Sequence, residues 1–301
     1  MKGLILSGGK GTRLRPLTYT RAKQLVPVAN KPVLFYGIEA LVEAGIRDIG
    51  IVVGDTSAEI QAAVGDGSAW NARVTYIAQD APRGLAHAVL ISESFLGREP
   101  FVMYLGDNLL AGSIAPFVND FLANTPAAQI LLTRVPDPER FGVAELKNEA
   151  VVKLIEKPRD PKSDLALVGV YLFGPEIFES VKRITPSFRN ELEITDAIQD
   201  LIDHGLTVNP HIVAGWWKDT GKLEDLLEAN RLILETFTER IEGDVDEKSS
   251  LEGKVVIEPG AIVRNSVIRG PAVIGKKARI DQAYIGPFTA IMNDVQIQGS
   301  E

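Results

Sequence analysis

The chain contains no cysteine among its 301 residues. This absence excludes disulfide bonds, thiolate nucleophiles and metal sites that depend on cysteine ligands. Histidine is nearly as scarce, because His87, His204 and His211 carry the only imidazole side chains. No Ser-His-Asp arrangement is evident either, so the sequence favours a reaction that needs no nucleophile from the protein.

Long apolar runs are missing as well. No uninterrupted run approaches the ~20 apolar residues that a membrane-spanning helix needs, so we expect no membrane span. The first predicted strand begins within one residue of the N-terminus, which leaves no room for a signal peptide, and a cytoplasmic location is expected. The net charge of −8 argues against a general binder of nucleic acid or of anionic membranes.

The most informative segment covers residues 7–32. An apolar run at residues 3–6 predicts a strand that leads directly into glycines at positions 8, 9 and 11. Without Cβ atoms such a loop can lie close to a ligand, and its backbone N–H groups can form an anion-binding concavity. Arg13 and Lys23 add two cations suited to phosphate oxygens. The segment therefore predicts a site for a nucleoside triphosphate.

Two better-known glycine loops are excluded here. The dinucleotide motif G-x-G-x-x-G, counted from Gly9 and Gly11, would need glycine where the chain has Leu14. The phosphate loop G-x-x-x-x-G-K-[ST] is also absent. The alternative interpretation is a glycine-rich turn with incidental surface cations, but the full pattern through Lys31 and Pro32 is far more specific than glycines alone.

Strands and helices alternate through the first part of the chain. The pattern predicts strands at residues 3–6, 49–53, 74–77 and 101–105, and helices at 32–44, 58–64 and 85–94. This alternation is typical of parallel βαβ units in an open three-layer sandwich. Ligands bind such sheets at the carboxyl ends of the strands, where the glycine loop and Asp107 both fall.

From about residue 129 the pattern changes. Short strands separated by turns are predicted at residues 130–132, 142–146, 151–155 and 167–173, followed by helices at 176–182, 193–206 and 223–241. We interpret this part as a more antiparallel region built onto the same sheet.

The tail carries a repeat. From position 256 to position 280, Val or Ile recurs every six residues, and Ile285, Ile291 and Ile297 continue the step after one slip. Hexapeptide repeats wind a parallel β-helix with apolar side chains stacked inside. The alternative is a strand-rich edge with coincidental spacing. The predicted domains are residues 1–242 and 250–301, the second either incomplete or capped by a partner because no capping helix is evident.

At about residues 1–240 the chain resembles the sugar-1-phosphate nucleotidylyltransferases, and among them the glucose-1-phosphate thymidylyltransferases. The pattern Gly-Gly-x-Gly-Thr-Arg-Leu-x-Pro-Leu-Thr, followed by Lys23, carries the resemblance. It implies a Rossmann-like three-layer α/β/α nucleotidyltransferase domain. Members with a repeat tail form a long subgroup, which implies a C-terminal left-handed parallel β-helix. Relatives assemble into homo-oligomers, so a homo-oligomer is expected.

The resemblance also implies a nucleotide site. Arg13 and Lys23 would hold the triphosphate. Gln79 and Gly84 would read the base, because a carboxamide both donates and accepts and so matches the edge of a pyrimidine; the alternative is a solvent-facing loop glutamine. The predicted nucleotide-binding residues are Leu6, Gly8, Gly9, Gly11, Thr12, Arg13, Gln24, Gln79, Gly84 and Asp107.

Two aspartates are predicted to hold Mg²⁺, which prefers carboxylate oxygens and keeps contacts to substrate phosphates. Asp107 lies in Gly-Asp-Asn after an apolar strand, and Asp219 lies in Trp-Lys-Asp-Thr-Gly. In relatives the aspartates of these motifs hold the metal. Taken alone, each is more typical of a turn or a helix cap.

The sugar phosphate requires its own site. Glu156 and Lys157 in Ile-Glu-Lys-Pro resemble the family motif in which Glu bonds sugar hydroxyls and Lys binds the phosphate; an isolated pair of this kind would more often be a surface ion pair. The full predicted set is Asn108, Gly142, Glu156, Lys157, Gly169, Tyr171 and Glu193. The catalytic set is Arg13, Lys23, Asp107, Lys157 and Asp219.

The resulting expectation is transfer of a nucleotidyl group from dTTP to glucose 1-phosphate, with pyrophosphate released and UTP as a secondary substrate. Positioning and electrostatics can carry such a reaction. A UTP-dependent enzyme that makes UDP-glucose or UDP-N-acetylglucosamine and an inactive sensor of nucleotide sugars remain alternatives. A hexapeptide acyltransferase is disfavoured, because no histidine follows His211.

Overall fold

The computed structural model describes residues 1–9 and 11–300. Packing divides the chain into two compact units. The first unit comprises Met1–Leu25 and Val33–Asp219, and the second unit comprises Val26–Pro32 and Thr220–Glu301. The predicted domain boundaries, 1–242 and 250–301, remain a prediction, because a packing unit and an independently folding domain are different properties.

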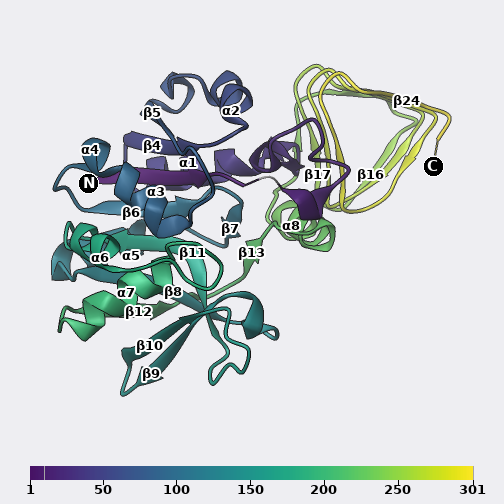
Figure 1. The fold of residues 1–301 in the computed structure, drawn as a ribbon. Coiled ribbons are helices and arrows are strands. Elements are labelled where there is room, and N and C mark those ends of the chain that lie inside the picture. Colours follow the sequence, from purple (N-terminus) through teal and green to yellow (C-terminus); the bar gives the residue numbers. More distant parts are fainter. Residues whose placement is uncertain (10, 301) are drawn as a thin grey trace. The chain divides into compact units, whose positions relative to one another are not determined.

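The first unit is built on one large mixed sheet (Figure 1). Strand β1 (Lys2–Ser7) runs parallel to β4 (Asp48–Val53) on one side and to β6 (Phe101–Leu105) on the other, and β5 (Arg73–Ala78) pairs parallel with β4. Strands β1 and β6 are neighbours and run parallel, so the glycine loop that follows β1 and Asp107, which follows β6, lie at the same edge of the sheet.

The second half of the same sheet is largely antiparallel, as predicted. Strand β11 (Leu165–Phe173) pairs antiparallel with β6 and with both other neighbours. The remaining strands of this half are β8 (Ala128–Arg134), β9 (Gly142–Lys147), β10 (Ala150–Glu156) and β12 (Val208–Ile212). Only β12 runs parallel to its partner, β8.

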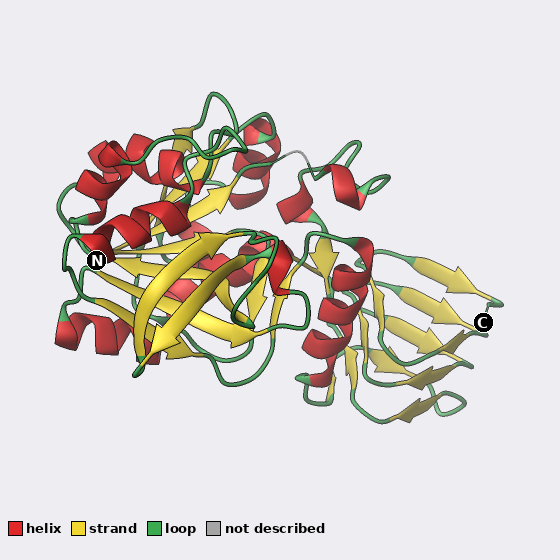
Figure 2. Ribbon diagram, turned by 60° about the horizontal axis from the view of Figure 1, so that its bottom comes forward, coloured by secondary structure: helices red, strands yellow, loops and turns green. Residues whose placement is uncertain are grey.

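Helices cover both faces of the sheet (Figure 2), and the residues of β1 show why. Leu4 and Leu6 belong to one hydrophobic core and Ile5 to another, since successive side chains of a strand point to opposite faces. This confirms the predicted three-layer sandwich. The helices are α1 (Val33–Glu43), α2 (Ser57–Val64), α3 (Leu85–Ile91), α4 (Glu93–Leu96), α5 (Ala115–Asn124), α6 (Ile177–Arg183) and α7 (Ile194–Asp203).

Shorter elements complete the first unit. The predicted helix at 85–94 is interrupted, with Ser92 between α3 and α4, where its hydroxyl donates to the carbonyl of Ala88 at 2.7 Å. A two-stranded sheet joins β7 (Asn108–Leu110) to β13 (Trp217–Asp219). Single 3₁₀ turns occur at η1 (Thr12–Leu14), η2 (Lys23–Leu25), η3 (Ser68–Trp70) and η4 (Pro138–Arg140).

The second unit contains helix α8 (Leu223–Glu235), which ends six residues before the predicted end at 241, and the hairpin β2 (Pro27–Val28) and β3 (Lys31–Pro32). The rest is a parallel β-helix, which confirms that prediction. Its strands are β14 (Arg240–Ile241), β15 (Asp244–Val245), β16 (Ser250–Glu252), β17 (Val255–Ile257), β18 (Ile262–Arg264), β19 (Val267–Arg269), β20 (Ala272–Ile274), β21 (Arg279–Asp281), β22 (Tyr284–Ile285), β23 (Thr289–Ile291) and β24 (Gln296–Gln298).

The β-helix repeats every 17 residues, not every 18. Val255, Ala272 and Thr289 lie in register in successive coils of one parallel sheet, and two further sheets form the other sides. One of the three steps in a coil is therefore five residues long. For this reason the inward residues at the start are Ile257 and Val263, each one position after the predicted Val256 and Ile262.

Among the residues that the structure describes, no helix is long and apolar enough to cross a membrane.

Candidate active site

The glycine loop follows β1 at the edge of the sheet. Gly9 and Gly11 both adopt positive φ, at 96° and 59°. A Cβ on Gly11 would lie 2.9 Å from the Cβ of Lys23. Both the positive φ and this close contact therefore favour glycine at position 11. Gln24 is buried and donates from Nε2 to the carbonyl of Gly8 at 2.7 Å. Gln24 therefore holds the loop in place.

Lys23 and Asp107 form a hydrogen-bonded ion pair between the glycine loop side and the end of β6. Burial alone would lower the pKa of Lys23 and raise that of Asp107. The opposite charge of the partner and the hydrogen bonds together outweigh burial, so the pKa of Lys23 lies above its ordinary value and that of Asp107 lies below. Asn108 adds a hydrogen bond from Nδ2 to Asp107 Oδ1 at 2.9 Å. Both groups are therefore held in their charged forms.

The pairing of β7 with β13 brings the second predicted metal ligand to the same place. Asp219 lies opposite Asn108 in this small sheet, one residue from Asp107. Trp217 Nε1 donates to Asn108 Oδ1 at 2.7 Å and fixes that side chain. Asp107 and Asp219 line one cavity of about 170 Å³ together with Arg13.

These residues fit a hard divalent cation. Mg²⁺ takes oxygen ligands, and one or two carboxylates with substrate phosphates suffice. Within the described residues, no group of three or more His, Cys, Asp or Glu side chains is placed to hold a metal ion. A cation at Asp107 and Asp219 would therefore depend on the substrate for its remaining ligands.

A second cavity, of about 300 Å³, lies on the other side of Asp107. It is lined by the glycine loop, by Lys23 and by the two predicted base readers, Gln79 and Gly84. Gly84 has φ of 101°, and a Cβ there would lie 2.3 Å from the carbonyl oxygen of Leu192. Leu192 donates to the carbonyl of Arg83 at 2.8 Å and accepts from the amide of Ala86 at 3.0 Å. Gly84 is thus required where two backbone segments meet.

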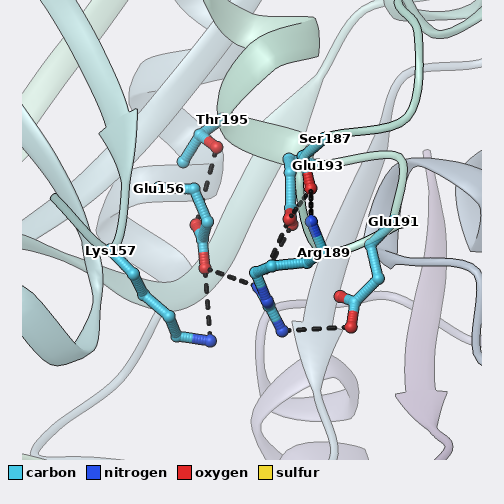
Figure 3. A network of polar contacts seen from close by, with 7 residues as sticks. All are labelled: Glu156, Lys157, Ser187, Arg189, Glu191, Glu193 and Thr195. Carbon is cyan, nitrogen blue, oxygen red and sulfur yellow. Dashed lines mark hydrogen bonds and ion pairs between the residues drawn. The ribbon is translucent and has the colours of Figure 1, made fainter.

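Three of the predicted sugar-phosphate residues, Glu156, Lys157 and Glu193, belong to a polar network that contains Arg189 (Figure 3). Arg189 Nη1 lies 3.3 Å from Oε1 of Glu156 and 3.3 Å from Oε1 of Glu193, and Nη2 lies 3.1 Å from Oε1 of Glu191. Lys157 Nζ lies 3.4 Å from Oε1 of Glu156. Glu193 also accepts a hydrogen bond from the hydroxyl of Ser187 at 2.8 Å.

Carboxylates outnumber cations in this network, and the pKa of Glu156 is shifted as a result of its surroundings. Burial raises the pKa of Glu156, and the neighbouring Glu193 raises it further. Lys157 and Arg189 lower it, but the net pKa stays above the ordinary value. Glu156 is therefore a buried carboxylate whose contacts with Arg189 and Lys157 do not fully offset the cost of burial.

Two glycines widen the sugar-side cavity. A Cβ on Gly142 would lie 2.7 Å from Thr195 Cγ2 and 3.1 Å from Glu156 Oε2. A Cβ on Gly169 would lie 2.5 Å from Asn108 Oδ1. Tyr171 is buried beside them, and burial raises its pKa, so its hydroxyl stays neutral.

Most of the predicted residues line one of the two cavities, and Asp107 lines both. The 300 Å³ cavity, which we call the nucleotide-side cavity, contains Leu6, Gly8, Gly9, Lys23, Gln79, Gly84 and Asp107. The 170 Å³ cavity, the sugar-side cavity, contains Arg13, Asp107, Asn108, Gly142, Glu156, Lys157, Gly169, Tyr171 and Asp219. Four predicted residues line neither cavity: Gly11, Thr12, Gln24 and Glu193.

Two residues of this region were not predicted from the sequence. Arg189 lines the nucleotide-side cavity and centres the carboxylate network, and Trp217 lines the sugar-side cavity against Phe141, with ring centroids 5.1 Å apart. Arg189 stands two residues before the Glu-Leu-Glu motif, and Trp217 opens the motif that contains Asp219. Both could have been found by extending those motifs.

The fold and this paired site define a class of enzyme, and the comparison with known families agrees. The model described as nucleotidyl transferase matches residues 2–236. The chain therefore belongs to the nucleotidyl transferase family, which confirms the class of enzyme that the opening segment predicts.

Individual relatives and solved structures show which members of the family this chain is similar to. The chain is 59% identical over 302 residues to a glucose-1-phosphate thymidylyltransferase of Streptomyces griseus, covering 100% of this chain and 85% of that protein. A crystal structure described as a glucose-1-phosphate thymidylyltransferase from Bacillus anthracis, in complex with sucrose, matches with a TM-score of 0.73 and 38% identity over 77% of this chain and 94% of the other. A UDP-glucose pyrophosphorylase bound to UDP-glucose matches with a TM-score of 0.69 and 26% identity, over 78% and 98%.

Proposed function

We propose that this enzyme transfers a thymidylyl group from dTTP to α-D-glucose 1-phosphate, giving dTDP-glucose and pyrophosphate. One observation carries the proposal: two cavities with different chemistry meet at Asp107. The nucleotide-side cavity offers a glycine loop and a lysine, and the sugar-side cavity offers carboxylates with a lysine. The 59% identity to a thymidylyltransferase over the full chain supports the choice of substrates.

The chemistry needs no covalent intermediate on the protein. A phosphate oxygen of glucose 1-phosphate attacks the α-phosphorus of dTTP and forms the new P–O bond. The bond from the α-phosphorus to the bridging oxygen breaks, and pyrophosphate leaves with that electron pair. The protein aligns the two phosphates and stabilises the charge, which is how phosphoryl-transfer enzymes accelerate such reactions.

Arg13 and Lys23 would neutralise the triphosphate. Arg13 presents a planar fork that suits two phosphate oxygens, and Lys23 is a compact charge. Without substrate Lys23 is bound to Asp107. Binding of the nucleotide therefore has to exchange a carboxylate partner of Lys23 for a phosphate partner.

Asp107 and Asp219 would hold Mg²⁺ at the junction of the two cavities. When bound, the cation would neutralise charge on the phosphates of the nucleotide. Asn108 and Trp217 orient the site, because Asn108 contacts both Asp107 and the indole N–H.

The sugar phosphate would be held by Lys157 and Glu156. Lys157 suits the phosphate. The carboxylate of Glu156 would accept hydrogen bonds from sugar hydroxyls, which would offset part of the burial that, together with the nearby Glu193, raises its pKa. Arg189, which lines the nucleotide-side cavity and contacts Glu156, is an additional cation near the reacting phosphates.

Gln79 would read the base. A single methyl group separates dTTP from UTP, and an apolar pocket gains only about 1–3 kcal/mol from one such group. UTP is therefore expected to be a slower second substrate. The same site supports the second candidate, a UTP-dependent uridylyltransferase, because a UDP-glucose pyrophosphorylase shares the fold at a TM-score of 0.69.

The test is the release of pyrophosphate with glucose 1-phosphate and MgCl₂, with dTTP, UTP, ATP, GTP and CTP compared side by side. Fast turnover with dTTP and slower turnover with UTP supports the proposal. A preference for UTP supports the uridylyltransferase. Silence with all five nucleotides would contradict both and favour a nucleotide-sugar sensor.

A further inference from the structure

The side-chain amide of Gln79 contacts the ring of His87. Gln79 follows β5, and its Nε2 atom lies 3.0 Å from Nδ1 of His87 and 3.4 Å from the carbonyl oxygen of Gly84. His87 lies on α3, is 9% exposed and lines neither the nucleotide-side nor the sugar-side cavity. It therefore touches the base reader without reaching the substrate cavities.

These two contacts determine where the protons are. A backbone carbonyl only accepts hydrogen bonds, so the atom of Gln79 that faces Gly84 must be the nitrogen. The same nitrogen faces His87 Nδ1 and has no lone pair to offer. His87 Nδ1 must therefore be unprotonated and accept, which makes the ring neutral with its proton on Nε2.

The charges around His87 agree with a neutral ring. Burial lowers the pKa of His87, and the cation of Arg83 lowers it further. Asp80 acts in the opposite direction, but its carboxylate is paired with Arg83 at 2.6 Å. The net pKa lies below the ordinary value, so the ring is neutral at neutral pH.

The amide oxygen of Gln79 consequently points away from His87. Oε1 lies 3.7 Å from the position of a Cβ on Gly8, at the wall of the glycine loop. An oxygen presented to a base accepts from N3–H of thymine or uracil. It repels cytosine, whose N3 is itself an acceptor.

We propose that His87 is a positioning residue, which fixes the carboxamide of Gln79 with its oxygen toward the base and thereby selects pyrimidines that carry N3–H over cytosine. This inference rests on the proposed role of Gln79 as base reader. Without an acceptor at Nδ1, only the longer contact to the Gly84 carbonyl, at 3.4 Å, opposes rotation of the amide. The amide can then turn over and present its NH₂ group, which suits cytosine instead.

The experiment compares kcat/KM for dTTP, UTP and CTP in two matched variants. His87→Leu fills the space but offers no acceptor, whereas His87→Asn places Oδ1 near the position of Nδ1. His87→Leu should lower the ratio of kcat/KM for dTTP over CTP about tenfold or more, mainly through KM, the size expected for one oriented hydrogen bond. His87→Asn should restore the ratio to within about threefold of wild type.

A double-variant cycle separates this role from packing. In a Gln79→Ala background, His87→Leu should leave the ratio for dTTP over CTP unchanged, since there is no amide left to orient. A general packing defect would lower activity equally in both backgrounds. An unchanged ratio in the folded His87→Leu variant itself would overturn the inference.

A measurement on the unaltered protein needs no variant. The ¹⁵N NMR signals of the His87 ring, recorded with dTTP bound, should show Nδ1 unprotonated and Nε2 protonated. A protonated Nδ1 would overturn the inference. A wild-type enzyme that prefers dTTP, combined with a negative result for His87, refutes only this inference, whereas a wild-type enzyme with no preference refutes the proposed function as well.

Discussion

The charged side chains of the two cavities differ in the direction of their pKa shifts. On the nucleotide side, Lys23 and Asp107 neutralise each other, and each pKa is shifted toward the charged form. On the sugar side, Glu156 contacts Arg189, which reaches over from the nucleotide-side cavity and also contacts Glu191 and Glu193, and the pKa of Glu156 is raised. The first is a pair in which each charge is compensated, and the second is a buried carboxylate whose contacts with Arg189 and Lys157 do not fully offset burial.

The difference follows from the two ligands that we propose. A triphosphate brings negative charge and a metal ion, so it can replace Asp107 as the partner of Lys23. A sugar brings neutral hydroxyl donors, and a buried carboxylate whose pKa stays raised gains from additional hydrogen bonds. The contrast therefore predicts different consequences for substitutions on the two sides.

The largest effect is expected where the cavities meet. Asp107→Asn keeps the shape of the side chain but removes the charge that balances Lys23 and the cation. We expect kcat for pyrophosphate release to fall about 10³-fold, in the range seen when one electrostatic group is lost from an active site. Asp164→Asn, which breaks the exposed ion pair with Arg134, is the control and should leave kcat unchanged. A loss of kcat of less than tenfold in Asp107→Asn would contradict the proposed role of the Asp107 charge at the junction of the two cavities.

Next comes a test on the sugar side alone. Lys157→Ala should raise KM for glucose 1-phosphate about 10–100-fold and leave KM for dTTP within about twofold, because a charged hydrogen bond to one substrate is lost. Lys182→Ala, which removes a surface ion pair with Glu93, serves as the matched control. If KM for dTTP rose as steeply as KM for glucose 1-phosphate, the division between the two sides would be wrong.

A substitution of Arg189 should affect both substrates, because Arg189 lines the nucleotide-side cavity and also contacts Glu156 of the sugar-side cavity. Arg189→Lys keeps the charge but loses the fork that contacts several carboxylates. We expect KM for both substrates to rise about 3–10-fold, within the energy of one hydrogen bond. Initial rates over a grid of the two substrate concentrations measure this, and a change confined to one KM would assign Arg189 to that side only.

The smallest effect concerns stability. Because the folded pKa of Glu156 is raised, its charged form destabilises the ligand-free protein above the ordinary value of 4.5, and the penalty disappears once the carboxyl is protonated in both states. Glu156→Gln should therefore raise the melting temperature by about 1–3 °C at pH 7 while slowing turnover.

Thermal unfolding at several pH values checks the sign. The gain from Glu156→Gln should vanish below pH 4.5, the ordinary pKa of the residue. A variant less stable than wild type at pH 7 would show that the contacts with Arg189 and Lys157 outweigh the cost of burying the charge.

Much of this site was accessible from the sequence, because it follows from chain order. The glycine loop and Asp107 directly follow strands, and the carboxyl ends of parallel strands meet at one edge. Asp219 was paired with Asp107 only through the family resemblance, and the β7–β13 sheet supplies the physical link.

What the sequence did not reveal depends on three-dimensional neighbours. The sequence places His87 within a predicted helix, but one histidine on a helix carries no sign that it faces Gln79. The raised pKa of Glu156 results first from burial in the folded chain and then from Glu193, which lies at a helix start far along the chain. The 17-residue repeat was missed for a different reason, because one five-residue step per coil resembles an isolated slip when only a few coils are present.

The most direct test of the account is ³¹P NMR of the wild-type protein mixed with dTTP, glucose 1-phosphate and MgCl₂. We expect the phosphate monoester signal of the sugar to decline while a pyrophosphate diester and free pyrophosphate appear in equal amounts, and only when both substrates are present. Orthophosphate released from dTTP alone, or binding of both substrates without any new signal, would contradict it.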